Sequence, residues 1–273
     1  MKVIVLGSNG MAGHIITQYL KQYGHEVITM AKTGADFAFD IENTLMVKAF
    51  LDNIPSVDYI INCIGLLVKD SQQRPDRAAL INSWFPHFLE HRYSGTHTRI
   101  IHLSTDCVFS GSKGNYIETD LHTEIGVYGK SKSLGELNNN KDVTFRMSII
   151  GPELKQTGTG LMNWIMNNPS KEVFGWVNAQ WNGITTLQLA KSINDYMLNP
   201  CYAGVYHLVS PVSVNKFELL TLMNDIYNLD KTIIRTFGPK PVNKILVDTR
   251  KLVKSVIPAY NIQLVELKNF AIK

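Results

Sequence analysis

A tyrosine and a lysine stand four residues apart in the stretch that covers residues 126–132. If residues 126–138 form a helix, Tyr128 and Lys132 share one face, with their Cβ atoms roughly 5–6 Å apart. An ammonium beside a phenol favours the phenolate, so the pKa of Tyr128 would fall and the phenol could exchange a proton nearer neutral pH. The same spacing also fits a solvated helix face, so other motifs must decide between the two interpretations.

A glycine-rich turn lies at the start of the chain. Residues 3–6 are wholly apolar, as in a buried parallel strand, and a helical pattern follows the turn and ends at Gly24. The order of strand, glycine turn and helix is what a dinucleotide site requires, although the spacing G-x-x-G-x-x-G differs from the commonest fingerprint. A turn without a ligand is the alternative. The residues that we expect to contact the dinucleotide here are Gly7, Asn9, Gly10, Met11 and Gly13.

The second expected strand, residues 26–30, is followed by a lysine where sites for NAD usually carry an acidic residue. Lys32 would attract the 2′-phosphate of NADP, so we expect NADP(H) to be preferred and NAD(H) to remain possible. A solvent-facing role for Lys32 is the alternative. Asp40 and Ile41 end a short third strand, residues 37–41, and are expected near the adenine.

Polar and small residues follow two further expected strands, residues 57–62 and 99–103. Open α/β sheets bind their ligands at the carboxyl ends of the strands. The first group, expected to contact the cofactor through its backbone, is Cys63, Ile64 and Gly65. The second is Ser104, Thr105 and Asp106, and a hydroxyl there could bond a carbonyl oxygen as charge builds on it.

Composition excludes several classes of protein. The net charge of +4, from 27 basic and 23 acidic residues, is too mild and dispersed for a nucleic-acid-binding protein. Three widely spaced cysteines read as reduced thiols, and no apolar run approaches the roughly 20 residues that span a bilayer. His87 and His91 could share a metal, but no third ligand lies nearby, so no metal site is expected. We expect a cytoplasmic protein with no nucleic-acid or membrane partner.

The pattern of elements predicts an α/β protein with a Rossmann-type, doubly wound parallel sheet. Residues 1–150 would form an NADP(H)-binding domain, to which residues 179–210 return. Residues 151–178 and 211–273 would form a smaller α+β substrate-binding region. A helix is expected over residues 73–94 and another over residues 265–270.

With these motifs in order, the chain resembles the extended short-chain dehydrogenase/reductases. The run STDCVFSG, followed by YIETD and VYGKSKSLGE, is similar to dTDP-4-dehydrorhamnose reductases and related nucleotide-sugar reductases of polysaccharide biosynthesis. The match runs from residue 1 to about residue 151 and weakens afterwards, in segments such as GVYHLVS and VDTRKL.

The resemblance implies reduction of a 4-keto-6-deoxy nucleotide sugar at a site of three catalytic residues. Tyr128 would protonate the C4 oxygen while NADPH delivers a hydride, Lys132 would lower the tyrosine pKa and hold the nicotinamide ribose, and Thr105 would bind the keto oxygen. Two departures concern the sugar: Cys107 replaces a tyrosine that the family usually has, and residues 180–183 lack the usual proline. The residues expected to contact the substrate are Ser104, Thr105, Cys107, Arg146 and Trp181, with Trp164 as a further stacking candidate.

Two other functions stay open. One is a nucleotide-sugar epimerase or dehydratase of the same superfamily, which would retain its cofactor. The other is a non-catalytic NADP-binding subunit, like the similar regulatory subunit of methionine adenosyltransferase. A homodimer is a further expectation.

Overall fold

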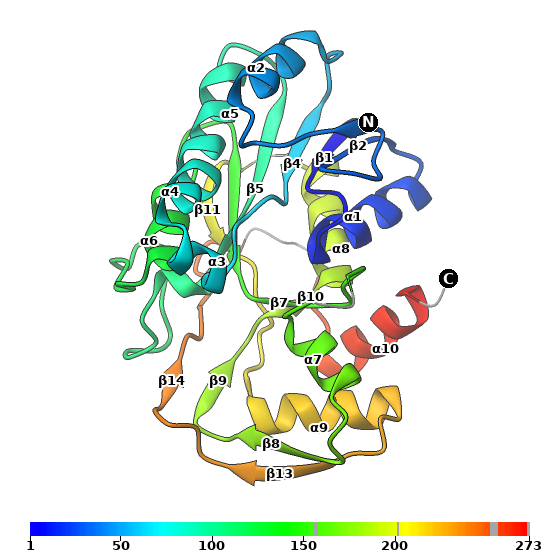
Figure 1. The fold of residues 1–273 in the computed structure, drawn as a ribbon, viewed down its shortest axis with the longest axis vertical. Helices are drawn as coiled ribbons and strands as arrows, with labels where there is room; N and C mark the ends of the chain where they lie inside the picture. Colours follow the sequence, from blue (N-terminus) through cyan, green and yellow to red (C-terminus); the bar gives the residue numbers. More distant parts are fainter. Residues whose placement is uncertain (156–157, 201, 252–255, 272–273) are drawn as a thin grey trace.

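Seven parallel strands form the central sheet of the computed structural model, which describes residues 1–155, 158–200, 202–251 and 256–271 (Figure 1). The strand order is β11-β6-β5-β4-β1-β2-β3. The expected doubly wound α/β fold is confirmed. Because the order reverses between β1 and β4, ligands are expected at the carboxyl ends of these strands. The strands are β1 (Lys2–Leu6), β2 (Glu26–Ala31), β3 (Phe37–Ala38), β4 (Tyr59–Asn62), β5 (Arg99–Thr105), β6 (Val143–Met147) and β11 (Gly204–His207).

Helices cover both faces of this sheet (Figure 1). On one face, α1 (Met11–Gln22) and α8 (Thr186–Leu198) bury apolar residues such as Ile16 and Ile193 against the strands. On the other face, α2 (Thr44–Asn53) and α5 (Phe85–Tyr93) pack around a second apolar core that includes Phe85, and α6 (Val127–Leu134) lies against β5. The wholly apolar strands of the sequence are explained by this burial on both sides.

Several expected elements differ in their bounds. The helix expected over residues 73–94 is broken at Arg74 and has four parts: α3 (Val68–Gln73), α4 (Pro75–Ala78), the π-helix η1 (Ala79–Trp84) and α5. Helix α6 ends at Leu134 and does not reach residue 138. The third strand stops at Ala38, before Asp40 and Ile41.

The rest of the chain forms a smaller α+β part below the sheet in Figure 1, connected to it through the pair β7 (Ile149–Ile150) and β10 (Ile184–Thr185). Strands β12, β9 and β14 make a three-stranded sheet, and β13 pairs with β8. Because β11 pairs with β6, residues 204–207 lie in the central sheet, while the division into domains stays a prediction. The elements are α7 (Leu161–Asn167), β8 (Glu172–Trp176), β9 (Ala179–Trp181), β12 (Val214–Asn215), α9 (Lys216–Tyr227), β13 (Thr232–Thr236), β14 (Val242–Asn243) and α10 (Tyr260–Ala271), which is longer than expected.

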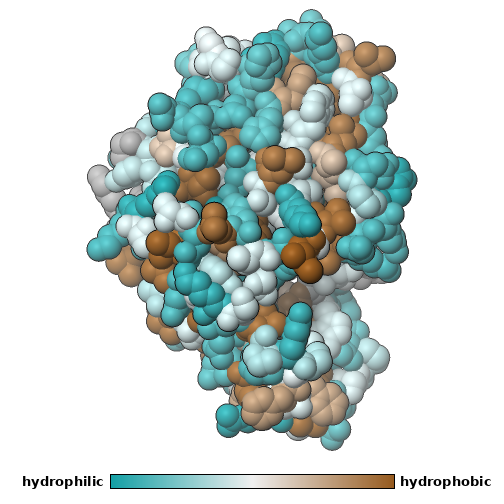
Figure 2. Space-filling model, turned by 90° about the vertical axis from the view of Figure 1, so that its left-hand side faces the viewer, coloured by the Kyte–Doolittle hydropathy of each residue, from teal (hydrophilic) through white to brown (hydrophobic). Residues whose placement is uncertain are grey.

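Figure 2 views the molecule from the side on which α3 and α6 lie in Figure 1, and shows apolar side chains gathered around the middle of this face. Exposed apolar residues of α3, of α6 and of the loop before it include Val68, Leu121, Ile125 and Leu134. Within the described ranges, no helix combines the length and apolar character needed to cross a membrane.

Candidate active site

Thr105 and Tyr128 meet at the carboxyl end of β5. Thr105 is the last residue of β5, and its hydroxyl accepts a hydrogen bond from the Cys107 amide at 3.1 Å, which caps the short 3₁₀ helix η2 (Asp106–Val108). Burial raises the pKa of Tyr128, and a hydrogen bond with the Thr105 hydroxyl acts in the opposite direction. The phenol is therefore protonated near neutral pH and can act as a proton donor.

Lys132 lies one helical turn further along α6, with 4% of its surface exposed. Its Nζ donates to the carbonyl oxygen of Leu103 at 2.7 Å and lies 3.3 Å from Nε2 of His102. Burial lowers the pKa of Lys132 to about 8. The expectation that Lys132 lowers the pKa of Tyr128 is corrected for this structure, because burial dominates the phenol and the ammonium is directed at β5.

Helix α6 is fixed against the π-helix by very close packing. A Cβ on Gly135 would lie 1.8 Å from the carbonyl oxygen of Asn82. The Asn82 side chain donates to the Ser131 hydroxyl at 3.0 Å and accepts from the Leu66 amide at 2.8 Å. Asn82 thus ties the loop after β4 to the helix that carries Tyr128 and Lys132. The sequence showed no sign of this role, although π-helical segments often occur at functional sites.

The glycine turn fits the pyrophosphate of a dinucleotide. Gly7 has a φ of 75°, and a Cβ on Gly13 would lie 2.2 Å from the Gly7 carbonyl oxygen, so both positions require glycine. Gly10 precedes α1 without a side-chain cap, which leaves the first amides of the helix available to an anion. The Ser8 hydroxyl is buried and has no hydrogen-bond partner among the described residues.

The other expected cofactor residues surround this turn. Asn9 donates to the Thr33 carbonyl oxygen at 2.6 Å, which joins the turn to the loop after β2. A Cβ on Gly7 would approach Ile64 to 3.0 Å and the Cys63 backbone to 3.2 Å, so the loop after β4 touches the turn. The Ile41 side chain belongs to the second apolar core, so any contact with an adenine would come from its backbone.

Lys32 is exposed and paired with two carboxylates. Its Nζ lies 2.9 Å from Asp40 and 3.3 Å from Glu42, and Glu42 also pairs with Arg77 at 2.7 Å. Lys32 and Asp40 lie beyond the ends of β2 and β3, and their contacts with the cofactor stay predictions. A 2′-phosphate placed there would meet Lys32 and Arg77 but also two negative charges.

Arg146 is an internal residue, which corrects its expected contact with the substrate. Its guanidinium is 2% exposed and uses all five N–H groups inside the protein. The acceptors are both carboxylate oxygens of Glu136 (2.9 and 2.7 Å), Nε2 of His207 (2.8 Å), Nε2 of His122 (2.8 Å) and the Glu118 carbonyl oxygen (3.4 Å). Ser104 donates to the same Glu136 at 2.6 Å, so its hydroxyl also serves this network.

Trp181 is likewise a core residue. It is 4% exposed, its indole N–H donates to the Ser148 hydroxyl at 2.8 Å, and its ring packs against Tyr260. The ammonium of Lys216, the first residue of α9, lies 5.3 Å from the centre of the Trp181 ring. Cys107 lies near Tyr128, and burial raises its thiol pKa to about 11, while its expected contact with the substrate stays a prediction.

Two lysines of the smaller part approach the end of β5. The positive charges of Lys244 and Lys216 both act on the buried Asp106, whose pKa is nevertheless raised by burial. Lys244 also pairs with Glu124 at 3.6 Å. Among the described residues, no carboxylate lies within ion-pair distance of Lys216. Lys216 and Lys244 therefore bring two amino groups to this end of β5, a feature that the sequence did not reveal.

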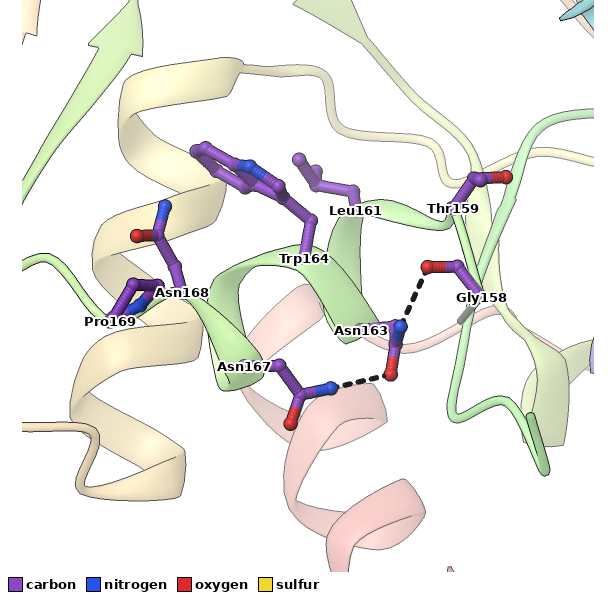
Figure 3. A pocket seen from close by; sticks show the side chains of 8 residues that line it. All are labelled: Gly158, Thr159, Leu161, Asn163, Trp164, Asn167, Asn168 and Pro169. Carbon is purple, nitrogen blue, oxygen red and sulfur yellow. Dashed lines mark hydrogen bonds between the residues drawn. The ribbon is translucent and has the colours of Figure 1, made fainter. Parts of the chain in front are cut away.

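A separate shallow pocket of about 690 Å³ lies at α7 (Figure 3). Trp164, 43% exposed, lies over it between Leu161 and Asn168, and Asn163 bonds the Gly158 carbonyl oxygen at 2.7 Å. The pocket adjoins the cofactor side of the molecule, because a Cβ on Gly160 would lie 2.5 Å from the Met11 side chain. Stacking of a ligand on Trp164 stays a prediction.

His87 and His91 carry no metal site in the structure. His87 bonds Glu90 at 2.7 Å and the Leu134 carbonyl oxygen at 2.7 Å. In the described part of the chain, no three histidine, cysteine or acidic side chains gather as metal ligands would.

Comparison with known proteins now identifies the family. The family model that describes the RmlD substrate binding domain matches residues 1–245 of this chain. The chain belongs to this family. Among the proteins similar to this chain, the dTDP-4-dehydrorhamnose reductase of Salmonella typhimurium is 26% identical over 82% of this chain and 78% of its own length. Methionine adenosyltransferase 2 subunit beta of Xenopus tropicalis is 24% identical over 88% of this chain and 76% of its own.

A solved structure gives the same fold. The dTDP-4-dehydrorhamnose reductase of Bacillus anthracis, in complex with NADP, superposes with a TM-score of 0.84 at 20% identity over 98% of each chain. The expected likeness to dTDP-4-dehydrorhamnose reductases and other nucleotide-sugar enzymes is confirmed by membership of the RmlD family. The roles of the individual site residues stay proposals.

Proposed function

We propose that the protein reduces a 4-keto-6-deoxy nucleotide sugar with NADPH, with NADH as a poorer reductant. The observation that carries this proposal is the meeting of Thr105, Tyr128 and Lys132 at the end of β5, beside a glycine turn suited to a dinucleotide. A protonated phenol next to a hydroxyl is what a ketone oxygen needs as it gains negative charge. The NADP-bound reductase of similar fold supports the choice of cofactor, and the likeness to dTDP-4-dehydrorhamnose reductases supports the substrate class.

Each residue has a distinct task in the proposed reaction. The cofactor, held by the turn at residues 7–13, supplies the hydride. Thr105 would hold the keto oxygen by donating its hydroxyl proton, in place of its 3.2 Å contact with Asp106. Tyr128 would give its proton to the same oxygen, and Lys132 would return a proton to the phenolate.

The two lysines beside Asp106 support an anionic substrate. A nucleotide sugar carries a diphosphate, and Lys216 has its ammonium free of ion pairs within the described residues. We propose that Lys216, assisted by Lys244, binds this diphosphate. The Cys107 side chain, smaller than a tyrosine at the same place, would leave room for a sugar other than that of the related reductases.

The test is a spectrophotometric assay of NADPH oxidation against a panel of 4-keto sugars linked to dTDP, UDP and GDP. Oxidation with one of these sugars supports the proposal. Turnover without net NADPH oxidation would favour an epimerase or dehydratase instead. The regulatory-subunit alternative is supported by the likeness to subunit beta, but a binding subunit would not require the protonated phenol and the threonine hydroxyl to meet. A cytoplasmic location and a homodimer remain proposals, and the mass in solution would test the latter.

A further inference from the structure

Asn62 and His102 lie behind Lys132 and have no task in the proposed reaction. The two residues face each other on β4 and β5, and both are fully buried. Nδ1 of the imidazole lies 3.2 Å from Nδ2 of Asn62, and Nε2 lies 3.3 Å from Nζ of Lys132. Both nitrogens of the ring therefore face nitrogen atoms, so the position of each proton must follow from the partners.

The orientation of the Asn62 amide is fixed by its other contact. Its Oδ1 accepts a hydrogen bond from the Ile64 amide at 3.2 Å, so the NH₂ group must be the end that faces His102. An NH₂ group donates and cannot accept. Nδ1 of His102 must therefore accept, and in a neutral imidazole the proton then lies on Nε2.

That proton points at the amine of Lys132. An ammonium has no lone pair and would place N–H against N–H, whereas a neutral amine can accept from Nε2 and still donate to the Leu103 carbonyl oxygen. We infer that Asn62 and His102 are positioning residues that favour the neutral form of Lys132. The catalytic meaning of this inference rests on the proposed function, because Lys132 is the lysine of the proposed site.

The charges around Lys132 are compatible with this inference. Glu136, just after α6, favours the ammonium, but both of its oxygens are engaged by Arg146. Burial raises the thiol pKa of Cys63 to about 12, so this neighbour after β4 is neutral. Burial keeps the pKa of His102 well below its usual value, so its imidazole is neutral. The phenol of Tyr128 is also protonated.

A lysine held in this way can exchange its proton near neutral pH. After Tyr128 has given its proton to the substrate oxygen, the ammonium form of Lys132 can transfer one proton to the phenolate. The resulting amine accepts the Nε2–H of His102 until it regains a proton from solvent. A lysine with an ordinary pKa near 10.4 would remain a fixed charge through such a cycle.

The proton positions can be measured without any substrate. We would label the full-length protein with ¹⁵N-histidine, record long-range ¹H–¹⁵N correlations at pH 7, and assign His102 from the signals lost in His102→Gln. The inference predicts a protonated Nε2 and an unprotonated Nδ1. A proton on Nδ1, or on both nitrogens, would overturn it. This NMR measurement needs no catalysis, so its result tests the inference independently of the reductase proposal.

A pair of variants tests the part played by Asn62. In Asn62→Asp, a carboxylate oxygen replaces the NH₂ group and should draw the proton to Nδ1, which leaves Nε2 free to accept from an ammonium. Asn82→Asp is the matched control, since it places the same charge beside α6 without touching His102. We expect the His102 tautomer to change in Asn62→Asp and to stay the same in Asn82→Asp. The pKa of Lys132, measured from the pH dependence of its ¹³Cε chemical shift, should rise more in Asn62→Asp than in the control. An unchanged tautomer in folded Asn62→Asp would contradict the inference.

Discussion

Glu136 and Arg146 form a two-point ion pair inside the protein, with N–O distances of 2.9 and 2.7 Å. Glu136 follows the helix of Tyr128 and Lys132, and Arg146 lies on β6. The same guanidinium reaches His207 on β11, whose ring nitrogen Nδ1 bonds the Val247 carbonyl oxygen at 2.9 Å. One buried cation therefore connects the end of the proposed catalytic helix to a segment about a hundred residues later.

Replacing this cation should destabilise the protein. In Arg146→Met, the Glu136 carboxylate would stay buried without its partner, and we expect a loss of about 3–5 kcal/mol in the free energy of unfolding. Urea unfolding measures the loss, and the double variant Arg146→Met/Glu136→Gln should recover part of it. If Arg146→Met has normal stability but a raised KM for the substrate, Arg146 binds the substrate and its structural role is contradicted.

Stability should fall in mild acid because of His207. Burial, together with the charge of Arg146, lowers the pKa of His207 to about 4 from an ordinary value of 6.5. Between these two values the unfolded chain binds a proton that the folded protein refuses, so the free energy of unfolding rises with pH. The contribution is complete above pH 6.5 and disappears as pH falls towards 4. Urea unfolding at a series of pH values should show this slope, and His207→Asn should make it shallower.

Tyr128→Phe should remove catalysis and spare cofactor binding. Loss of the proton donor should lower kcat by about 10²–10⁴-fold. The dissociation constant for NADPH, measured by fluorescence titration, should change little because the glycine turn is untouched. Wild-type turnover in this variant would exclude Tyr128 as the donor.

Lys216→Ala should weaken substrate binding more than it slows the chemical step. Losing a hydrogen bond to a charged group costs about 1.5–3 kcal/mol, which corresponds to a KM for the nucleotide sugar raised roughly tenfold or more. Lys171→Ala is the control, since this exposed lysine pairs with Asp230 in the smaller part. Equal KM values in both variants would count against a diphosphate at Lys216.

Lys32→Ala should reduce the preference for NADPH. If Lys32 leaves Asp40 and Glu42 to meet the 2′-phosphate, the KM for NADPH should rise about tenfold, while that for NADH should stay nearly constant. Lys113→Ala, which removes an exposed lysine paired with Asp120, should alter neither value. Wild-type enzyme that uses NADH as well as NADPH would contradict the assignment.

The sequence predicted those parts of the site whose geometry is local. The glycine turn depends on backbone contacts within a few residues, and the Tyr128–Lys132 spacing is a property of one helix. The residue types and their spacing were therefore sufficient to place the glycine turn and the Tyr128–Lys132 pair at the same edge of the sheet. The class of fold followed from the regular alternation of apolar strands and amphipathic helices.

The expectations that needed correction concern residues whose partners are distant in the chain. Arg146 reads as a free cation until Glu136, His122 and His207 are placed around it. Trp181 reads as a stacking platform until Ser148 and Tyr260 enclose it. Asn62 and His102 drew no attention because each sits in an ordinary strand, and their relation to Lys132 arises only when β4, β5 and α6 come together.

The place of β11 in the sheet matters for anyone who wants to dissect the molecule. A fragment cut after residue 150 would hold every recognisable sequence signature of the site, yet β6 would lose its outer neighbour and become an unprotected edge. Helix α1 would lose the covering provided by α8, and Arg146 would lose His207. Expression trials should therefore begin with the entire chain, since the half that carries the main motifs depends on a strand whose sequence resembles the family only weakly.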